Sequence, residues 1–153
     1  MSIAAVSIAN LLYRYAELFD AGDLDSAVAL FAHARFRTGG ADIDTLDHAG
    51  LLRLWRRHVK VHPDGTPRTK HVVTNPIIEV DDLAGTATCR SYYTVLQQTD
   101  AVPLQVIAAG RYHDEFECVD GQWRFSYRDY SMLDPLGDLR DHLTIFTGGP
   151  DPD

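Results

Sequence analysis

The chain has 153 residues, of which 45% are hydrophobic, and its formal net charge is −8 at pH 7. This length and composition are typical of a single globular domain that buries a core without needing disulfides or a metal. The acidic balance argues against a surface for nucleic acid or anionic membranes, since both require clustered Lys and Arg, and it favours a small, neutral ligand.

The first residues lack the basic stretch that opens a secretory signal, and no apolar run approaches the roughly 20 residues of a membrane span. We therefore expect a cytoplasmic protein. Cys89 and Cys118 both fall in strand-like runs without a CxxC partner. Two such cysteines predict neither a disulfide framework nor a metal site.

The first part of the chain is predicted to be helical. Apolar residues recur at three- and four-residue spacing from Ile8 to Phe19, as on one face of a helix. Asp23 can cap a short second helix, and Asp47 can cap a third that ends before Pro63.

The second part is predicted to be mainly β-sheet, preceded by a brief extended piece at residues 35–38. Alternating runs separated by turn residues predict strands at about 68–76, 86–98, 104–118 and 123–131. Pro76 interrupts the first strand, and residues 77–80 could continue it past a bulge or on an edge. Three helices followed by about four antiparallel strands give an α+β domain. We place the domain at residues 1–147, where Leu136, Leu139 and Leu143 could cover part of the sheet, and a polar tail at residues 148–153.

The strand that starts at Thr69 carries a histidine within a β-branched run. Side chains alternate along a strand, so His71 shares a face with Thr69 and lies opposite Lys70. Lys70 should face water, which places His71 inside. A buried imidazole without a hydrogen-bond partner loses about 1–3 kcal/mol, so His71 should have a polar neighbour.

Several short motifs, in this order and spacing, resemble the SnoaL-like branch of the nuclear transport factor 2 superfamily. They are YAELFD at residues 15–20, GDL at 22–24, ALF at 29–31, TKH at 69–71, NP at 75–76, GRY at 110–112 and DGQWRF at 120–125. The resemblance covers roughly residues 5 to 131. It implies an NTF2-like, cystatin-like fold, in which three N-terminal helices lie on the concave face of a cone-shaped antiparallel sheet and leave a pocket at the open end.

Within that superfamily the pattern is similar to scytalone dehydratase and, more loosely, to hexachlorocyclohexane dehydrochlorinase. There, a histidine at the start of a strand works with an aspartate at the end of the first helix. The matching positions here are His71 and Asp20, and Tyr15 and Phe19 take the places of aromatic residues that line the dehydratase pocket.

The dehydratase also has a second pocket histidine and a pocket asparagine. An ungapped count places these near Gln97 and Tyr112, which argues against scytalone itself as the substrate. We favour Tyr93 over Tyr92 as a pocket residue, because Tyr93 shares a strand face with Gln97. Trp55 is expected in the core, where it could also offer a wall to a flat ligand.

A carboxylate hydrogen-bonded to imidazole fixes the tautomer and leaves the second nitrogen free to take a proton from carbon. The alternative is a purely structural pair that ties the first helix to the sheet. His58 and His62 have the spacing of two metal ligands, but no acidic or Cys ligand accompanies them, so we interpret them as surface residues. His142 carries no pattern, and Arg111 and Arg128 are expected to form cross-strand ion pairs.

The sequence therefore predicts a lyase or isomerase that acts on a small hydrophobic, cyclic substrate. We expect no cofactor or metal, since dinucleotide-binding and P-loop spacings are absent from the sequence. The alternative is a non-catalytic binding or assembly subunit like the β subunits of ring-hydroxylating dioxygenases. In either case we expect a homodimer through the outer sheet face, with Ile107 and Ala109 in the interface.

Overall fold

The structure is a computed structural model, and it describes residues 2–38 and 46–144. The helices are α1 (Ile3–Asp20), α2 (Leu24–Ala29) and α3 (His48–His58). The strands are β1 (Arg35–Arg37), β2 (Thr69–Asp81), β3 (Thr86–Gln97), β4 (Gln105–Val119), β5 (Gln122–Asp129) and β6 (Leu133–Leu136). The order of helices before sheet agrees with the sequence analysis, and the expected tail at residues 148–153 lies outside the described residues.

The strands form one open sheet in the order β1-β5-β4-β3-β2, and β6 pairs with β4 beside this path. Two features correct the expectation of about four antiparallel strands. β1 pairs in parallel with β5, and β6 adds a short strand that the sequence did not predict. Both strands are too short for alternation to be recognised, at three and four residues.

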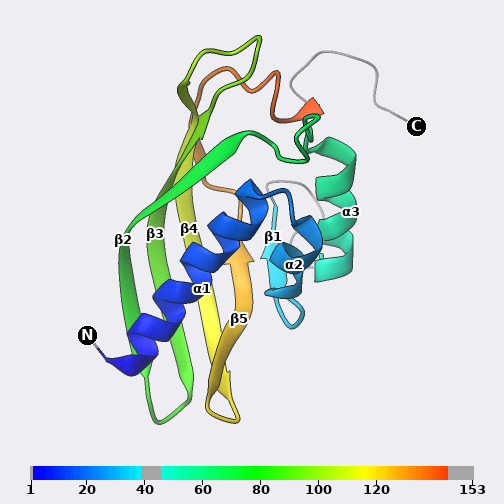
Figure 1. Cartoon of the computed structure of the whole chain (residues 1–153). Coiled ribbons are helices and arrows are strands. Elements are labelled where there is room, and N and C mark those ends of the chain that lie inside the picture. The colour runs from blue at the N-terminus through cyan, green and yellow to red at the C-terminus, as the bar shows by residue number, and fades with distance from the viewer. Residues whose placement is uncertain (1, 39–45, 145–153) are drawn as a thin grey trace.

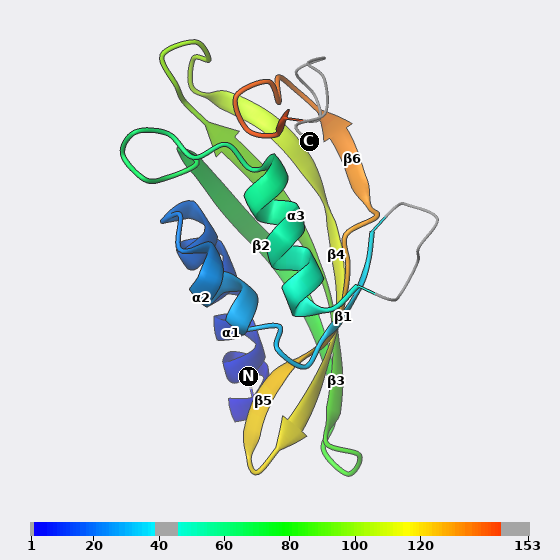
Figure 2. The same ribbon diagram turned by 90° about the vertical axis from the view of Figure 1, so that its right-hand side faces the viewer.

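The helices cover one face of the strongly bent sheet, as Figures 1 and 2 show from two sides. Side-chain oxygens of Ser2, Asp23 and Asp47 cap the three helices by accepting hydrogen bonds from backbone N–H groups. α3 ends at His58, earlier than expected, because Val59 is already extended and forms a β-bridge with Leu143. None of the helices in the described ranges is long and apolar enough to cross a membrane.

Two of the register shifts in the sheet bear on our sequence expectations. The β2–β3 register shifts between Thr74 and Ile77, around Pro76, where a ladder donor is missing. The second shift lies between β3 and β4, where Val95 pairs with Ala108 but Leu96 pairs with Val106. The extra residue is Ile107.

The position of Ile107 corrects our expectation for the outer sheet face. A bulge turns two successive side chains of β4 to the same side, so Ile107 and Ala108 both point inward. Ile107 is 0% exposed and belongs to the core, whereas Ala109 is half-buried. Ile107 is therefore not available to a partner.

A C-terminal strap, residues 137–144, passes over the open end of the sheet. The Lys60 backbone N–H donates to the His142 carbonyl (2.9 Å), and the Thr99 hydroxyl donates to Asp141 Oδ2 (2.6 Å). Leu139 is buried, as expected for a residue that covers the sheet, but Leu136 precedes the strap and is 52% exposed. The strap forms the far wall of the main cavity.

Candidate functional site

The cavity has a volume of about 350 Å³ and lies between α1, α3, the inner sheet face and the strap. Its lining is mostly apolar and aromatic, with Thr38 and several histidine and tyrosine side chains as the polar groups. None of the described lining residues is Asp, Glu, Lys or Arg. A pocket of this kind suits a small uncharged molecule.

Asp20 and His71 form a hydrogen-bonded pair at this cavity. Asp20 is the last residue of α1, and His71 is the third residue of β2. His71 Nδ1 lies 2.6 Å from Asp20 Oδ1, and the His71 backbone N–H donates to Oδ2 at 2.7 Å. The Thr69 hydroxyl donates to Oδ1 at 2.8 Å, so three donors from β2 hold one carboxylate.

These contacts set the pKa of Asp20. Burial alone would raise the pKa of Asp20, but the hydrogen bonds and charge of His71 outweigh burial and lower that pKa below its usual value. An ionised Asp20 accepts the Nδ1 proton, which selects the tautomer of the imidazole in which Nε2 carries the free lone pair. His71 lines the cavity, and its Nε2 forms no hydrogen bond within the described residues.

Aromatic rings surround the His71 imidazole. The Phe19 ring centre lies 5.0 Å from it, and the Phe19 and Trp55 rings meet edge to face at 5.1 Å. In another part of the cavity wall, Tyr93 stacks on Tyr112 at 4.2 Å. All four of these aromatic residues line the cavity together with Tyr15, whereas Tyr92 is 56% exposed on the other sheet face.

Gln97 does not take the pocket position that the sequence suggested. Its Nε2 donates to the carbonyls of Pro67 (3.0 Å) and Asp141 (2.9 Å), and its side chain is not among the cavity-lining residues. The residue faces inward as expected, but it lies at the end of β3, beyond the cavity. Gln97 anchors the strap.

The sequence analysis missed two cavity histidines. His142, on the strap, is 6% exposed and lines the cavity with its ring 6.3 Å from that of His71. His58 also lines the cavity, and its Nδ1 lies 3.1 Å from Thr144 Oγ1. Neither was visible in the sequence, because both depend on where the strap folds back.

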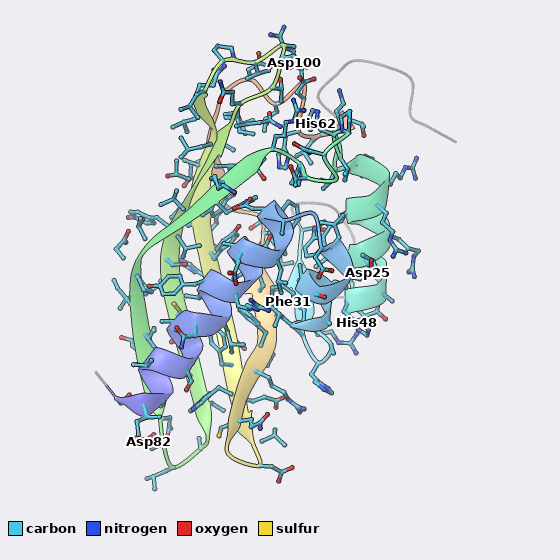
Figure 3. All side chains as sticks on the ribbon, in the orientation of Figure 1. Asp25, Phe31, His48, His62, Asp82 and Asp100 are labelled. Atoms are coloured by element: carbon cyan, nitrogen blue, oxygen red, sulfur yellow. The ribbon has the colours of Figure 1, made fainter. Side chains whose placement is uncertain are left out.

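The pair of His58 and His62 was weighed as a metal site from its spacing. His62 Nε2 lies 3.1 Å from the Asp141 carbonyl oxygen, at the end of the molecule where the loop after α3 meets the strap (Figure 3). The two side chains thus each contact a strap residue. No group of three or more potential metal ligands occurs within residues 2–38 and 46–144.

A buried ion pair lies beneath the tyrosine side of the cavity. Arg128 donates to both carboxylate oxygens of Asp114, at 2.7 and 2.9 Å, and neither side chain is exposed. The guanidinium lies 4.6 Å from the Tyr15 ring centre and 4.0 Å from that of Tyr112. Burial raises the pKa of both tyrosines, so their hydroxyl groups stay protonated.

Three solved structures resemble this fold. A protein of unknown function from Mycobacterium tuberculosis is 27% identical with a TM-score of 0.68, over 88% of this chain and 73% of that chain. Two proteins come from Novosphingobium aromaticivorans. The β subunit of a proposed aromatic-ring-hydroxylating dioxygenase is 17% identical (TM-score 0.67, 88% and 91% covered), and a proposed scytalone dehydratase is 20% identical (TM-score 0.63, 83% and 82% covered).

None of the curated proteins matches the sequence significantly. The SnoaL-like domain model, in contrast, matches residues 3–129, which include α1, α2, α3 and the strands β1 to β5. Asp20, His71 and most of the aromatic residues of the cavity wall lie within this match, and the strap lies beyond it. Because the match spans most of the chain, the protein belongs to the SnoaL-like domain family.

Proposed function

We propose that the protein is a cofactor-independent lyase or isomerase that acts on a small, hydrophobic, cyclic substrate. The observation that carries the proposal is the 2.6 Å contact between Asp20 Oδ1 and His71 Nδ1 at the wall of an apolar cavity. Nε2 is the general base that takes a proton from a substrate carbon. Asp20 orients the imidazole and stabilises the imidazolium that forms.

The cavity supports this chemistry in two further ways. Flat rings in the cavity wall suit a ring-shaped substrate, which would contact Phe19 beside His71 and the Tyr93–Tyr112 stack. The protonated hydroxyl group of Tyr15 is a donor for negative charge that develops on a substrate oxygen. The Tyr15 and His71 ring centres are 6.3 Å apart, so one small molecule can contact both.

The experiment is a turnover assay on small cyclic ketones and hydroxyketones, followed by substitution of the dyad. His71→Gln keeps a polar side chain of similar size, and we expect it to lower kcat by ~10²–10⁴ while the fold persists. Asp20→Asn should also lower kcat, because an amide favours a different orientation of the ring. The matched control is His113→Gln on the exposed outer face, and wild-type turnover by His71→Gln would mean that the pair is structural.

A second candidate function is assembly, as in the dioxygenase β subunit whose structure is similar. Its supporting observation is the outer face of the sheet, where Val72, Ile77, Tyr92 and Val106 are all more than 40% exposed. If assembly is the function, substitutions of Asp20 or His71 would leave the biological role intact, and substitutions on the outer sheet face would abolish it. The same face supports our proposal of a homodimer, with these residues in place of Ile107.

A further inference from the structure

The buried side chain of His142 has a ring nitrogen without a hydrogen-bond partner. Four buried side-chain atoms in the described residues have no hydrogen-bond partner, and they belong to Ser91, Gln97, Arg128 and His142. Of these four residues, His142 alone lines the cavity. The unpartnered atom of His142 is Nδ1. A buried polar group without a partner loses about 1–3 kcal/mol, so the ring calls for a partner such as a water molecule or a polar ligand atom.

The main chain on both sides of His142 is firmly held, so the ring position is not accidental. The His142 carbonyl accepts from the Lys60 N–H at 2.9 Å, and its own N–H donates to the Leu139 carbonyl at 3.0 Å. The preceding carbonyl, of Asp141, accepts from Gln97. The strap thus presents an imidazole to the cavity across from His71, with ring planes inclined at 65°.

We propose that His142 is a ligand-binding residue, which hydrogen-bonds an uncharged oxygen atom of the ligand while His71 faces the neighbouring part of the same ligand. This inference rests on the proposed function and adds its specificity: the ligand is a ring that carries a hydroxyl or carbonyl group, and not a carboxylate. The His71 and His142 rings are 6.3 Å apart and both line the cavity, so one small ligand can contact both imidazoles from the cavity side.

The charges around the cavity explain the preference for a neutral group. Burial first, and then the charge of His71, lower the pKa of His142 to about 3, so His142 supplies no positive charge at neutral pH. Arg128 is already paired with Asp114 and lies behind the tyrosine rings. An anionic ligand would therefore lose its hydration without gaining a counter-ion from the described lining residues.

The test measures binding of three probes that share one bicyclic ring and differ in its substituent: naphthalene, 2-naphthol and 2-naphthoate. We expect the wild type to bind 2-naphthol about tenfold more tightly than naphthalene, as one hydrogen bond to a buried group contributes about 1.4 kcal/mol, and to bind 2-naphthoate most weakly. His142→Phe should abolish the preference for 2-naphthol over naphthalene, because phenylalanine offers no hydrogen-bonding atom. His142→Gln should restore part of the preference.

A spectroscopic measurement separates a direct contact from an indirect effect. The ¹⁵N resonances of the His142 ring should shift when 2-naphthol is added and stay in place when naphthalene is added. Absence of a preference for 2-naphthol in the wild type, or its persistence in His142→Phe, would overturn the inference. Binding requires no turnover, so these results stand apart from the His71→Gln assay that tests catalysis.

Discussion

Asp20 shows how a single carboxylate can serve both stability and chemistry. It is the last residue of α1, where the partial negative charge of the helix end disfavours another anion. Three donors from Thr69 and His71 compensate for this position. Donors from β2 therefore stabilise the ionised form of Asp20. In turn, the carboxylate at the end of α1 orients the imidazole of His71.

The pKa of His142 leads to a prediction about acid stability. Below its ordinary pKa of 6.5 the unfolded chain takes up a proton at this residue, but the folded chain does not until the pH reaches about 3. Stability therefore falls with decreasing pH across this window, by up to about 1.4 kcal/mol per pH unit.

Urea unfolding of the wild type and of His142→Leu at pH 7, 6, 5 and 4 measures this contribution. The variant cannot take up the proton, so its free energy of unfolding should fall less steeply than that of the wild type. Asp20 does not interfere, because its pKa is lowered and its contribution is lost only below its ordinary value of 3.8. Parallel curves for the two proteins would show that His142 titrates normally.

At the scale of elements, sequence patterns predicted the helices and strands whose formation depends on residues close together in the chain. Capping aspartates and apolar periodicity placed the three helices, and alternation along β2 placed His71 inward opposite Lys70. β6 and the course of the strap were not predicted, because distant residues hold them in place, although Leu139 was expected to cover the sheet. Gln97 was misplaced for the same reason, since facing inward does not reveal that the strand has passed the end of the cavity.

The strap itself should loosen when its anchor is removed. Gln97→Leu is similar in size but eliminates the hydrogen bonds to the Pro67 and Asp141 carbonyls. Two such bonds contribute about 1–3 kcal/mol, so amide hydrogen exchange at His142 and Leu143 should accelerate about tenfold or more. Gln98→Leu, at an exposed neighbouring position, is the control. If the strap amides exchange equally slowly in both variants, contacts other than those of Gln97 hold the strap in place.

At the scale of the whole molecule, one sheet face encloses the cavity and the other is left open by the described part of the chain. The open face carries Val72, Ile77, Tyr92 and Val106 on three adjacent strands, β2, β3 and β4. Apolar residues gathered on an unpaired sheet face are typical of a self-complementary interface between two copies of a chain. We therefore predict a dimer with twice the 17.1 kDa mass of the chain.

Tyr92→Lys tests this dimer by placing a charge in the centre of the face. Tyr92 pairs with Arg111 on β4, and Arg111 already forms an ion pair with Asp134. A lysine at position 92 would therefore lose its hydration in the interface without gaining a free carboxylate, and Arg111 would repel it. Light scattering at micromolar concentration should give the mass of a dimer for the wild type and of a monomer for Tyr92→Lys. The control is Leu83→Lys, because Leu83 is fully exposed at the β2–β3 hairpin and lies away from the face. A monomeric wild type would refute the interface, and a dimeric Tyr92→Lys would place it elsewhere on the molecule.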